Sequence, residues 1–265
     1  DNKHDVRGSL HSSMAAGTGH FGCVSCHDEP EVHTKKMRSM LNMHAKSVSC
    51  ETCHIPTVAK TFPTKTWWDW TTAGDKKREV NMDANGMPDY MWKKGDFGWE
   101  KDLKPEYYWY NGKTDMYFLG DEMKSTEGIF QFNPLHGDVA DPTAKIGAFK
   151  VMRGKQFYDK NSKQILVPHL FGKGGYWKTL DWDKSFSDGM TSVGLEYSGE
   201  YDAIETEMFW PLYHMVAPAT QAAGCVECHT KDPAAEGLLD WDRLGYPGDP
   251  VKTGRSRATD GTIQW

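Results

Sequence analysis

The sequence lacks any long apolar segment and is poor in apolar residues overall. No run of 18 apolar residues occurs, so no segment is predicted to cross a membrane as a helix. Apolar side chains make up 38% of the 265 residues, whereas about 45–50% is usual for a soluble domain. The side chains alone therefore provide little apolar material for a core.

The sequence also lacks an excess of basic residues. Its 31 Lys and Arg stand against 37 Asp and Glu, a net charge of −6. Nucleic-acid-binding domains are usually basic, so this function is excluded. The chain begins at Asp1 with neither an initiator Met nor an apolar export segment. We interpret it as a mature or excised product from which any signal peptide has been removed.

The six cysteines form three copies of one motif, C-x-x-C-H, with none left over. This motif is typical of c-type haem attachment. The two thiols reach the two vinyl groups of one porphyrin, and the histidine that follows is the proximal ligand of the iron. The motifs therefore predict three covalently attached haems c. The predicted attachment residues are Cys23, Cys26, Cys50, Cys53, Cys225 and Cys228, and the predicted proximal ligands are His27, His54 and His229.

Three other interpretations of the cysteines explain the pattern less well than haem attachment. Two C-x-x-C pairs can form a zinc site, but the third pair then has no partner and the three histidines at one offset are unexplained. A thioredoxin-like redox pair occurs once, near a βαβ pattern, which is not found here. A disulfide across a two-residue gap closes a small, strained loop. Haem attachment is favoured over all three.

Haem attachment has consequences for location and fold. It occurs outside the cytoplasm, so we expect an exported protein, periplasmic or extracellular. Porphyrins also supply the buried surface that the side chains lack. The expected fold class is a multihaem cytochrome c, mainly α-helical, with short β-hairpins and much irregular structure wrapped around covalent haems.

Three regions follow one another along the chain and are expected to form one compact unit. Residues 1–60 are a two-haem segment rich in histidine, residues 61–200 are free of haem motifs and rich in aromatics, and residues 201–265 are a helical third-haem segment with a C-terminal tail. The Trp67–Trp70 cluster is expected to pack against a porphyrin or fill the core.

Local patterns predict individual elements within these regions. The spacing of Met37, Met40, Leu41 and Met43 predicts a helix over 35–47. The Asn111-Gly112 pair between two aromatic runs, 107–110 and 116–118, predicts a hairpin. A second, weaker hairpin is predicted across 159–162. A helix is predicted over 202–230, in which Pro211 produces a kink or begins a new first turn.

The ligand on the open side of each iron separates electron transfer from catalysis. A second histidine gives a low-spin haem suited to electron transfer, whereas a vacant position can bind substrate. Eight of the 11 histidines lie outside the motifs. The distal candidates are His44, His214, His20, His33 and His11, with His136, His4 and His169 less favoured and methionine ranked below histidine. The surplus suggests that His11 or His20 serves a haem on another chain.

Several stretches carry residue patterns that are not generic to haem proteins. They are 44–56 (HAKSVSCETCHIP), 67–70 (WWDW), 104–107 (KPEY), 205–212 (ETEMFWPL) and 244–250 (LGYPGDP). In these stretches the chain resembles octahaem c-type cytochromes of the tetrathionate reductase family, in their C-terminal part. The resemblance implies mostly bis-histidine haems packed closely, and one lysine-ligated catalytic haem that reduces tetrathionate, nitrite or hydroxylamine. No C-x-x-C-K occurs here, so that catalytic haem is not expected on this chain.

Three hypotheses of function follow. The leading one is electron transfer by a trihaem cytochrome, to or from other multihaem proteins. The second is a part in a reductase of tetrathionate, nitrite or hydroxylamine, with the catalytic haem on another chain or at a displaceable site here, so enzyme activity is left open. The third is assembly with other multihaem cytochromes or further copies of the chain, sharing haem ligands. Nucleic acid and membrane spans are not expected.

Overall fold

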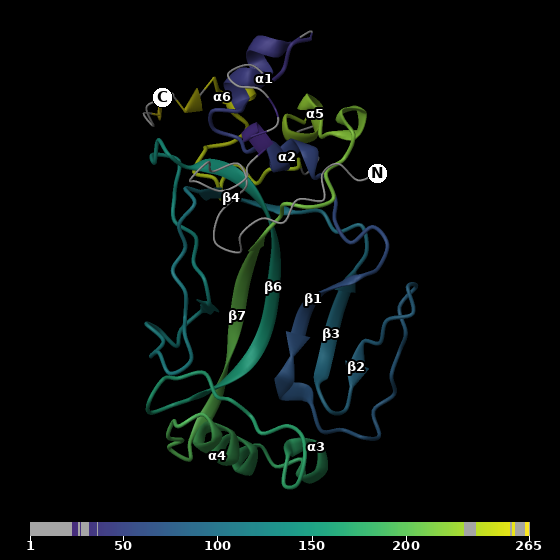
Figure 1. The fold of residues 1–265 in the computed structure, drawn as a ribbon, viewed down its shortest axis with the longest axis vertical. Coiled ribbons are helices and arrows are strands. Elements are labelled where there is room, and N and C mark those ends of the chain that lie inside the picture. The colour runs from purple at the N-terminus through teal and green to yellow at the C-terminus, as the bar shows by residue number, and fades with distance from the viewer. Residues whose placement is uncertain are drawn as a thin grey trace.

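The computed structural model describes residues 23–25, 27, 32–35, 37–230, 237–254, 256–257 and 263–264. Cys26 and three of the candidate histidines, His4, His11 and His20, lie outside these ranges. Figure 1 shows an elongated molecule, with the C-x-x-C-H segments and the C-terminal residues gathered at one end and a long twisted sheet running to the other.

The helices are short. They are α1 (Arg38–His44), α2 (Cys50–His54), α3 (Tyr176–Thr179), α4 (Trp182–Ser192), α5 (Cys225–Cys228) and α6 (Pro250–Thr253), with single 3-10 turns at η1 (Cys23–Ser25), η2 (Trp70–Thr72) and η3 (Ala219–Gln221). Three of these, η1, α2 and α5, are parts of the C-x-x-C-H motifs.

The strands form one mixed sheet of seven and a separate pair. They are β1 (Thr64–Asp69), β2 (Tyr90–Met91), β3 (Gly95–Glu100), β4 (Glu106–Tyr110), β5 (Ile129–Gln131), β6 (Lys145–Asp159), β7 (Tyr201–Pro211), β8 (Ser256–Arg257) and β9 (Ile263–Gln264). The order in the large sheet is β2-β3-β1-β6-β7-β5, and β4 pairs with the first part of β6. Strand β1 is parallel to β6, and β5 is parallel to β7, while the other pairs are antiparallel.

The long strand β6 connects the two ends of the molecule. It has 15 residues and pairs along most of its length with β7, from Phe149↔Pro211 to Asp159↔Tyr201. Its start pairs with β4 and its middle with β1. Figure 1 shows β6 running from the helices of the C-x-x-C-H end toward α4 at the far end. The first residues of β6 therefore form the support on which the motif segments rest.

The mainly α-helical fold expected from the sequence is wrong, because the chain has more sheet than helix. The main error is the helix over 202–230, since Tyr201–Pro211 is strand β7. Apolar residues on both faces of β7 gave the mixed spacing that resembles a helix, since Ile204 is buried on one face and Phe209 on the other. Pro211 ends β7 instead of kinking a helix.

The hairpin around Asn111-Gly112 is also wrong. The aromatic strand β4 pairs with β6, and the 116–118 run forms no strand with it. The second hairpin has its predicted turn: Asp159 N–H donates to Gln164 O at 2.9 Å, and Tyr158 bridges Ile165 in antiparallel fashion. The helix predicted over 35–47 is present as the shorter α1.

Two apolar clusters stabilise the ends of the sheet. At the C-x-x-C-H end, residues that follow α2 and β7 pack with residues of β4, β6 and the C-terminal segment: Ile55, Val58, Tyr107, Trp109, Ile146, Leu212, Leu239, Leu244 and Tyr246. At the far end, α4 covers the sheet with Phe186 and Met190, which pack with Leu166. The first cluster places the motif segments directly on the sheet.

Replacing Phe186 with alanine is expected to lower the free energy of unfolding by about 3–5 kcal/mol. The side chain is 0% exposed, and its ring centre lies 5.2 Å from that of Phe157 and 5.3 Å from that of Trp182. Loss of the ring leaves a cavity that these neighbours cannot fill. Urea unfolding followed by far-UV circular dichroism measures the change.

Phe171→Ala is the matched control. Phe171 is 76% exposed, so the same truncation is expected to cost no more than about 0.5 kcal/mol. Equal losses for the two variants would contradict the assignment of Phe186 to the far cluster.

Candidate haem sites

The second motif is a single helical turn that rests on the start of β6. Helix α2 begins at Cys50, and residues three apart lie on one face of a helix, which puts Cys50 and Cys53 side by side. Thr52, on the opposite face, is buried and donates its hydroxyl to Ile146 O at 2.7 Å, and Ser49 N–H donates to the same carbonyl at 3.0 Å. The motif is therefore held on the sheet by its own backbone and by a threonine.

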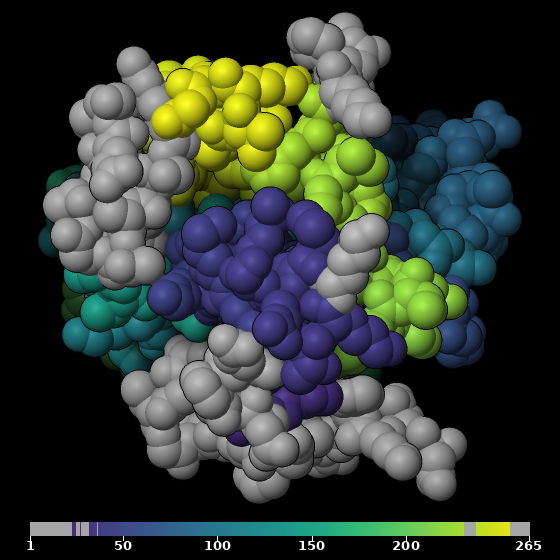
Figure 2. Space-filling model, turned by 90° about the horizontal axis from the view of Figure 1, so that it is seen from above, coloured from purple at the N-terminus to yellow at the C-terminus, as the bar shows by residue number. Residues whose placement is uncertain are grey.

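The third motif is held beside the second by backbone hydrogen bonds. Helix α5 spans Cys225–Cys228, and the carboxylate of Glu227 accepts the N–H of Gly224 at its N-terminus. Ahead of it, Ala217 N–H donates to His54 O at 2.7 Å and Ala223 N–H donates to Cys53 O at 2.8 Å. Figure 2, which looks onto this end, shows the second-motif region (purple to blue) with the third-motif segment (light green) and the C-terminal residues (yellow) around it.

The first motif reaches the second through its cysteine. Cys23 begins the 3-10 turn η1, and His27 N–H donates to Cys23 O at 2.9 Å. The thiols of Cys23 and Cys50 share a hydrogen bond, which raises the pKa of Cys23 and lowers that of Cys50. Cys26, the other cysteine of this motif, lies outside the described residues. All three motifs thus meet at one end of the sheet, with the second between the first and the third.

The remaining thiols belong to Cys53 and Cys228, which are partly buried, and to Cys225, which is exposed. Burial raises the pKa of the Cys53 thiol, and burial raises the pKa of the Cys228 thiol to about 12. The thiols of Cys53 and Cys228 are consequently neutral at ordinary pH. No disulfide joins the five cysteines that the structure describes.

Two histidine rings face each other across a space that suits a metal. The ring centres of His44, the last residue of α1, and His229, which follows α5, lie 6.2 Å apart with an interplanar angle of 30°. A metal ion bound between two imidazole nitrogens at about 2 Å each puts the ring centres roughly 6 Å apart. Burial, and secondarily the charge of His229, lowers the pKa of His44, which favours the neutral ring with a free lone pair.

The other predicted distal ligands are placed differently. His33 is half-buried, and its Nδ1 lies 3.0 Å from Asn42 Oδ1, so its other ring nitrogen is the one left for a metal. His214 is exposed in the loop after β7. The less favoured His136 contacts Asp115 at 2.8 Å, and His169 lies 3.8 Å from Asp188 near α4. His20 and His11 belong to the part of the chain that is not described.

Sequence reasoning missed several polar groups at this end. Asp249 hydrogen-bonds to His229, and Trp241 stacks on the same imidazole. The phenol oxygens of Tyr107 and Tyr213 are buried and have no hydrogen-bond partner among the described residues. Burial raises the pKa of both phenols. One of these residues could have been noticed in the sequence: an Asp directly before Pro250 is typical of a helix N-terminus, which marks Asp249.

These features fit haem c. Paired thiols, each pair followed by an imidazole, are the donor set that c-type attachment needs. The His44–His229 spacing admits a metal ion. Buried phenols without a partner are costly unless a bound group supplies one, and both phenols lie at the C-x-x-C-H end. The residues that would hold haem are therefore the motif cysteines and histidines, with His44 opposite His229.

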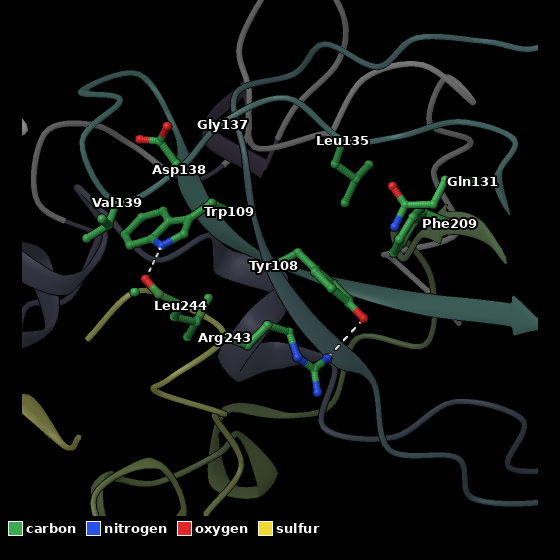
Figure 3. Close-up of a pocket in the computed structure, with 11 residues that line it drawn as sticks. Tyr108, Trp109, Gln131, Leu135, Gly137, Asp138, Val139, Phe209, Arg243 and Leu244 are labelled. Atoms are coloured by element: carbon green, nitrogen blue, oxygen red, sulfur yellow. Dashed lines mark hydrogen bonds between the residues drawn. The ribbon is translucent and has the colours of Figure 1, made fainter. Parts of the chain in front are cut away.

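One cavity lies next to this end but contains none of these residues. Its volume is ≈ 240 Å³, and Figure 3 shows it between β4, the 135–139 segment and the C-terminal segment. Arg243 donates to Tyr108 Oη at 2.9 Å and to Glu106 at 3.1 Å, and Trp109 Nε1 donates to Leu244 O at 2.8 Å. These bonds attach the C-terminal segment to the sheet, and the charge of Arg243 is neutralised by its carboxylate partners.

Comparisons with known proteins agree with the haem interpretation. Residues 65–232 match the family model described as bacterial cytochrome c. The fold is similar to the crystal structure of octaheme cytochrome c from Shewanella oneidensis, with a TM-score of 0.82 and 44% sequence identity over 95% of this chain and 57% of that one. The chain thus spans little more than half of the octahaem chain. No curated protein matches the sequence.

The match confirms the resemblance to octahaem c-type cytochromes that the sequence patterns indicated. Within the part of the chain that the structure describes, no helix has both the length and the apolar character of a membrane span. The family match covers most of the sheet and the third motif, and the structural match extends over nearly the whole chain. The chain belongs to the bacterial cytochrome c family and is a multihaem c-type cytochrome.

Proposed function

We propose that the chain is an electron-transfer module that carries three haems c and exchanges electrons with other multihaem proteins. The observation that carries the proposal is the convergence of the three C-x-x-C-H motifs: Cys23 contacts Cys50, and the backbone of the second motif is hydrogen-bonded to the segment that leads into the third. Fast electron exchange requires redox centres that lie close together, and motifs in contact satisfy that requirement.

In this proposal, different residues hold the porphyrin and the iron of each haem. When bound, haem supplies an iron that changes its charge by one electron. The motif cysteines fix the porphyrin edges, and His27, His54 and His229 are the proximal ligands in this proposal. His44 is the distal ligand opposite His229, and a ligand on each side keeps the iron low-spin and closed to substrate. For the other two irons the distal candidates are His33, His20, His11 and His214.

Apolar residues around the second and third motifs shield the proposed haem sites from solvent, as suits electron transfer. Ile55, Tyr107 and Leu239 are buried beside the second and third motifs, and an apolar shell around a metal site limits the access of water. We infer an exported protein, periplasmic or extracellular, because c-type haem is attached there. Its partners in this proposal are other multihaem cytochromes or further copies of the chain.

The second candidate function is a part in a larger reductase of tetrathionate, nitrite or hydroxylamine. Two observations favour it: the resemblance to the tetrathionate reductase family, and the coverage of only 57% of the octahaem chain. Since no C-x-x-C-K occurs in this sequence, a lysine-ligated catalytic haem would belong to another chain. In that case this chain would pass electrons to the site of reduction.

Two measurements on the isolated holoprotein test the proposal. The haem content per chain is expected to be three, and the electron paramagnetic resonance spectrum of the oxidised protein is expected to be mainly low-spin ferric. A dominant high-spin signal, or a haem content below three, would contradict it. Turnover of tetrathionate, nitrite or hydroxylamine by the chain with a reduced dye would instead favour the reductase.

A further inference from the structure

A carboxylate binds the ring of His229, the proposed proximal histidine of the third motif. Asp249 Oδ1 lies 2.7 Å from His229 Nδ1, and the two side chains are only 8% and 19% exposed. A hydrogen bond between a carboxylate and an imidazole at this distance is short and shielded from water, so it is strong. It defines the tautomer, with the proton on Nδ1 and the lone pair on Nε2.

The carboxylate is held in place by its own helix end. Asp249 is the N-cap of α6, and its Oδ1 also accepts the N–H of Val251 at 3.0 Å. The backbone oxygen of Asp249 accepts the N–H groups of Lys252 and Thr253, each at 2.9 Å. Gly248, with φ of +120°, makes the turn into this cap, a conformation that glycine adopts without strain. The carboxylate is therefore already in position beside His229 before a metal binds.

The ring of His229 is fixed from a second direction. The indole of Trp241 stacks on it with ring centres 5.4 Å apart and an angle of 16° between the planes. The N–H of His229 donates to Cys225 O at 2.8 Å, which fixes the backbone at the end of α5. With Nδ1 bound to Asp249, the ring keeps a single nitrogen, Nε2, for the metal.

We infer that Asp249 is a positioning residue that orients His229 and lowers the reduction potential of the haem held between His229 and His44. Outer carboxylates raise the basicity of a metal-bound imidazole, and a more basic ligand stabilises the ferric state, which carries the higher charge, more than the ferrous state. The inference rests on the proposed function, since it assumes that His229 binds a haem iron. It adds a residue outside the three motifs that sets the redox properties of one site.

Asp249→Asn separates this role from helix capping. Asparagine caps helices about as well as aspartate, so α6 is retained, but a neutral amide cannot supply the negative charge beside Nδ1–H. Spectroelectrochemical titration of the holoprotein is expected to show one of three components moved to higher potential and the other two unchanged. A tenfold loss of ferric stabilisation corresponds to 59 mV for a one-electron couple.

Two further variants control the experiment. Asp242→Asn removes the same charge from an exposed residue of the same segment and is expected to leave all three potentials in place. Asp249→Glu retains a carboxylate and is expected to return the shifted component toward its original value. The proposal is overturned if Asp249→Asn leaves every potential unchanged, if Asp242→Asn moves the same component equally, or if Asp249→Glu shifts it as far as asparagine does.

The experiment distinguishes a failure of the Asp249 inference from a failure of the proposed function. Three low-spin haems with potentials that do not respond to Asp249 would remove this inference alone. A haem content below three, or a high-spin third haem in the unmodified protein, would remove the proposed ligation first. Haem content and spin state are therefore measured on every variant alongside the potentials.

Discussion

Replacing His44 with alanine is expected to convert one of the three haems from low-spin to high-spin. His44 ends α1 with its ring centre 6.2 Å from that of His229, and it is the proposed distal ligand there. Without it, the iron bound by His229 has an open position that water or an added ligand can occupy. About one third of the low-spin ferric signal is expected to be replaced by a high-spin signal, and cyanide is expected to bind one haem per chain.

His136→Ala is the matched control for His44→Ala. His136 is exposed and paired with Asp115 at 2.8 Å, and its loss is expected to leave the spin state of all three haems unchanged. Added imidazole is expected to return the His44 variant to the low-spin spectrum, because it fills the space that the side chain has left. A His44 variant that stays wholly low-spin and does not bind cyanide would show that another residue is the ligand.

The motif residues were predictable because their chemistry is local. In C-x-x-C-H, both thiols and the proximal histidine fall within one helical turn, as α2 shows from Cys50 to His54. His44 was the favoured distal candidate for the same reason, since it lies six residues before Cys50 in a segment with the apolar spacing of a helix. A reader of the sequence needs no tertiary contact to place these groups near one haem.

The sheet was not predictable because its strands pair over long distances. Strand β6 pairs with β7 through partners such as Phe149 and Pro211, and with β4 through Phe149 and Glu106. The aromatic run 107–110 pairs with the first residues of β6, about 40 residues later. Nothing in the run itself favours that partner over the 116–118 run across the Asn111 turn. Buried apolar residues lie on both faces of β7, with Ile204 on one face and Phe209 on the other, which removes the alternation by which a strand is recognised.

Asp249 and Tyr107 were missed for a related reason. Their importance arises from contact with the third motif, 20 residues before Asp249 in one case and more than 100 residues after Tyr107 in the other. Neither residue type is unusual in its local sequence. Contacts of this kind depend on how the C-terminal segment lies across β4, which is set by the Trp109–Leu244 hydrogen bond and the surrounding apolar cluster.

Replacing both cysteines of the second motif, Cys50→Ala with Cys53→Ala, is expected to have the largest effect on function. The central position of this motif follows from its contacts with Cys23 on one side and with the segment ahead of Cys225 on the other. The variant is expected to carry two haems instead of three. The two that remain are expected to exchange electrons slowly, because the centre that lies between their attachment sites has been removed.

The matched control removes the third motif in the same way, Cys225→Ala with Cys228→Ala. This variant also loses one haem, but the first and second motifs remain in contact through Cys23 and Cys50, so rapid exchange between their haems is expected to persist. Haem content by the absorption of the pyridine adduct, and re-equilibration after a flash-induced electron is added, distinguish the two variants. The chain itself is expected to fold in both, because Thr52 and the backbone of Ser49 hold the second motif to Ile146 without the cysteines. Equal exchange rates in the two variants would mean that the second haem does not lie between the first and the third. Electrons would then not pass through the haems in the order in which the three motifs lie at this end of the sheet.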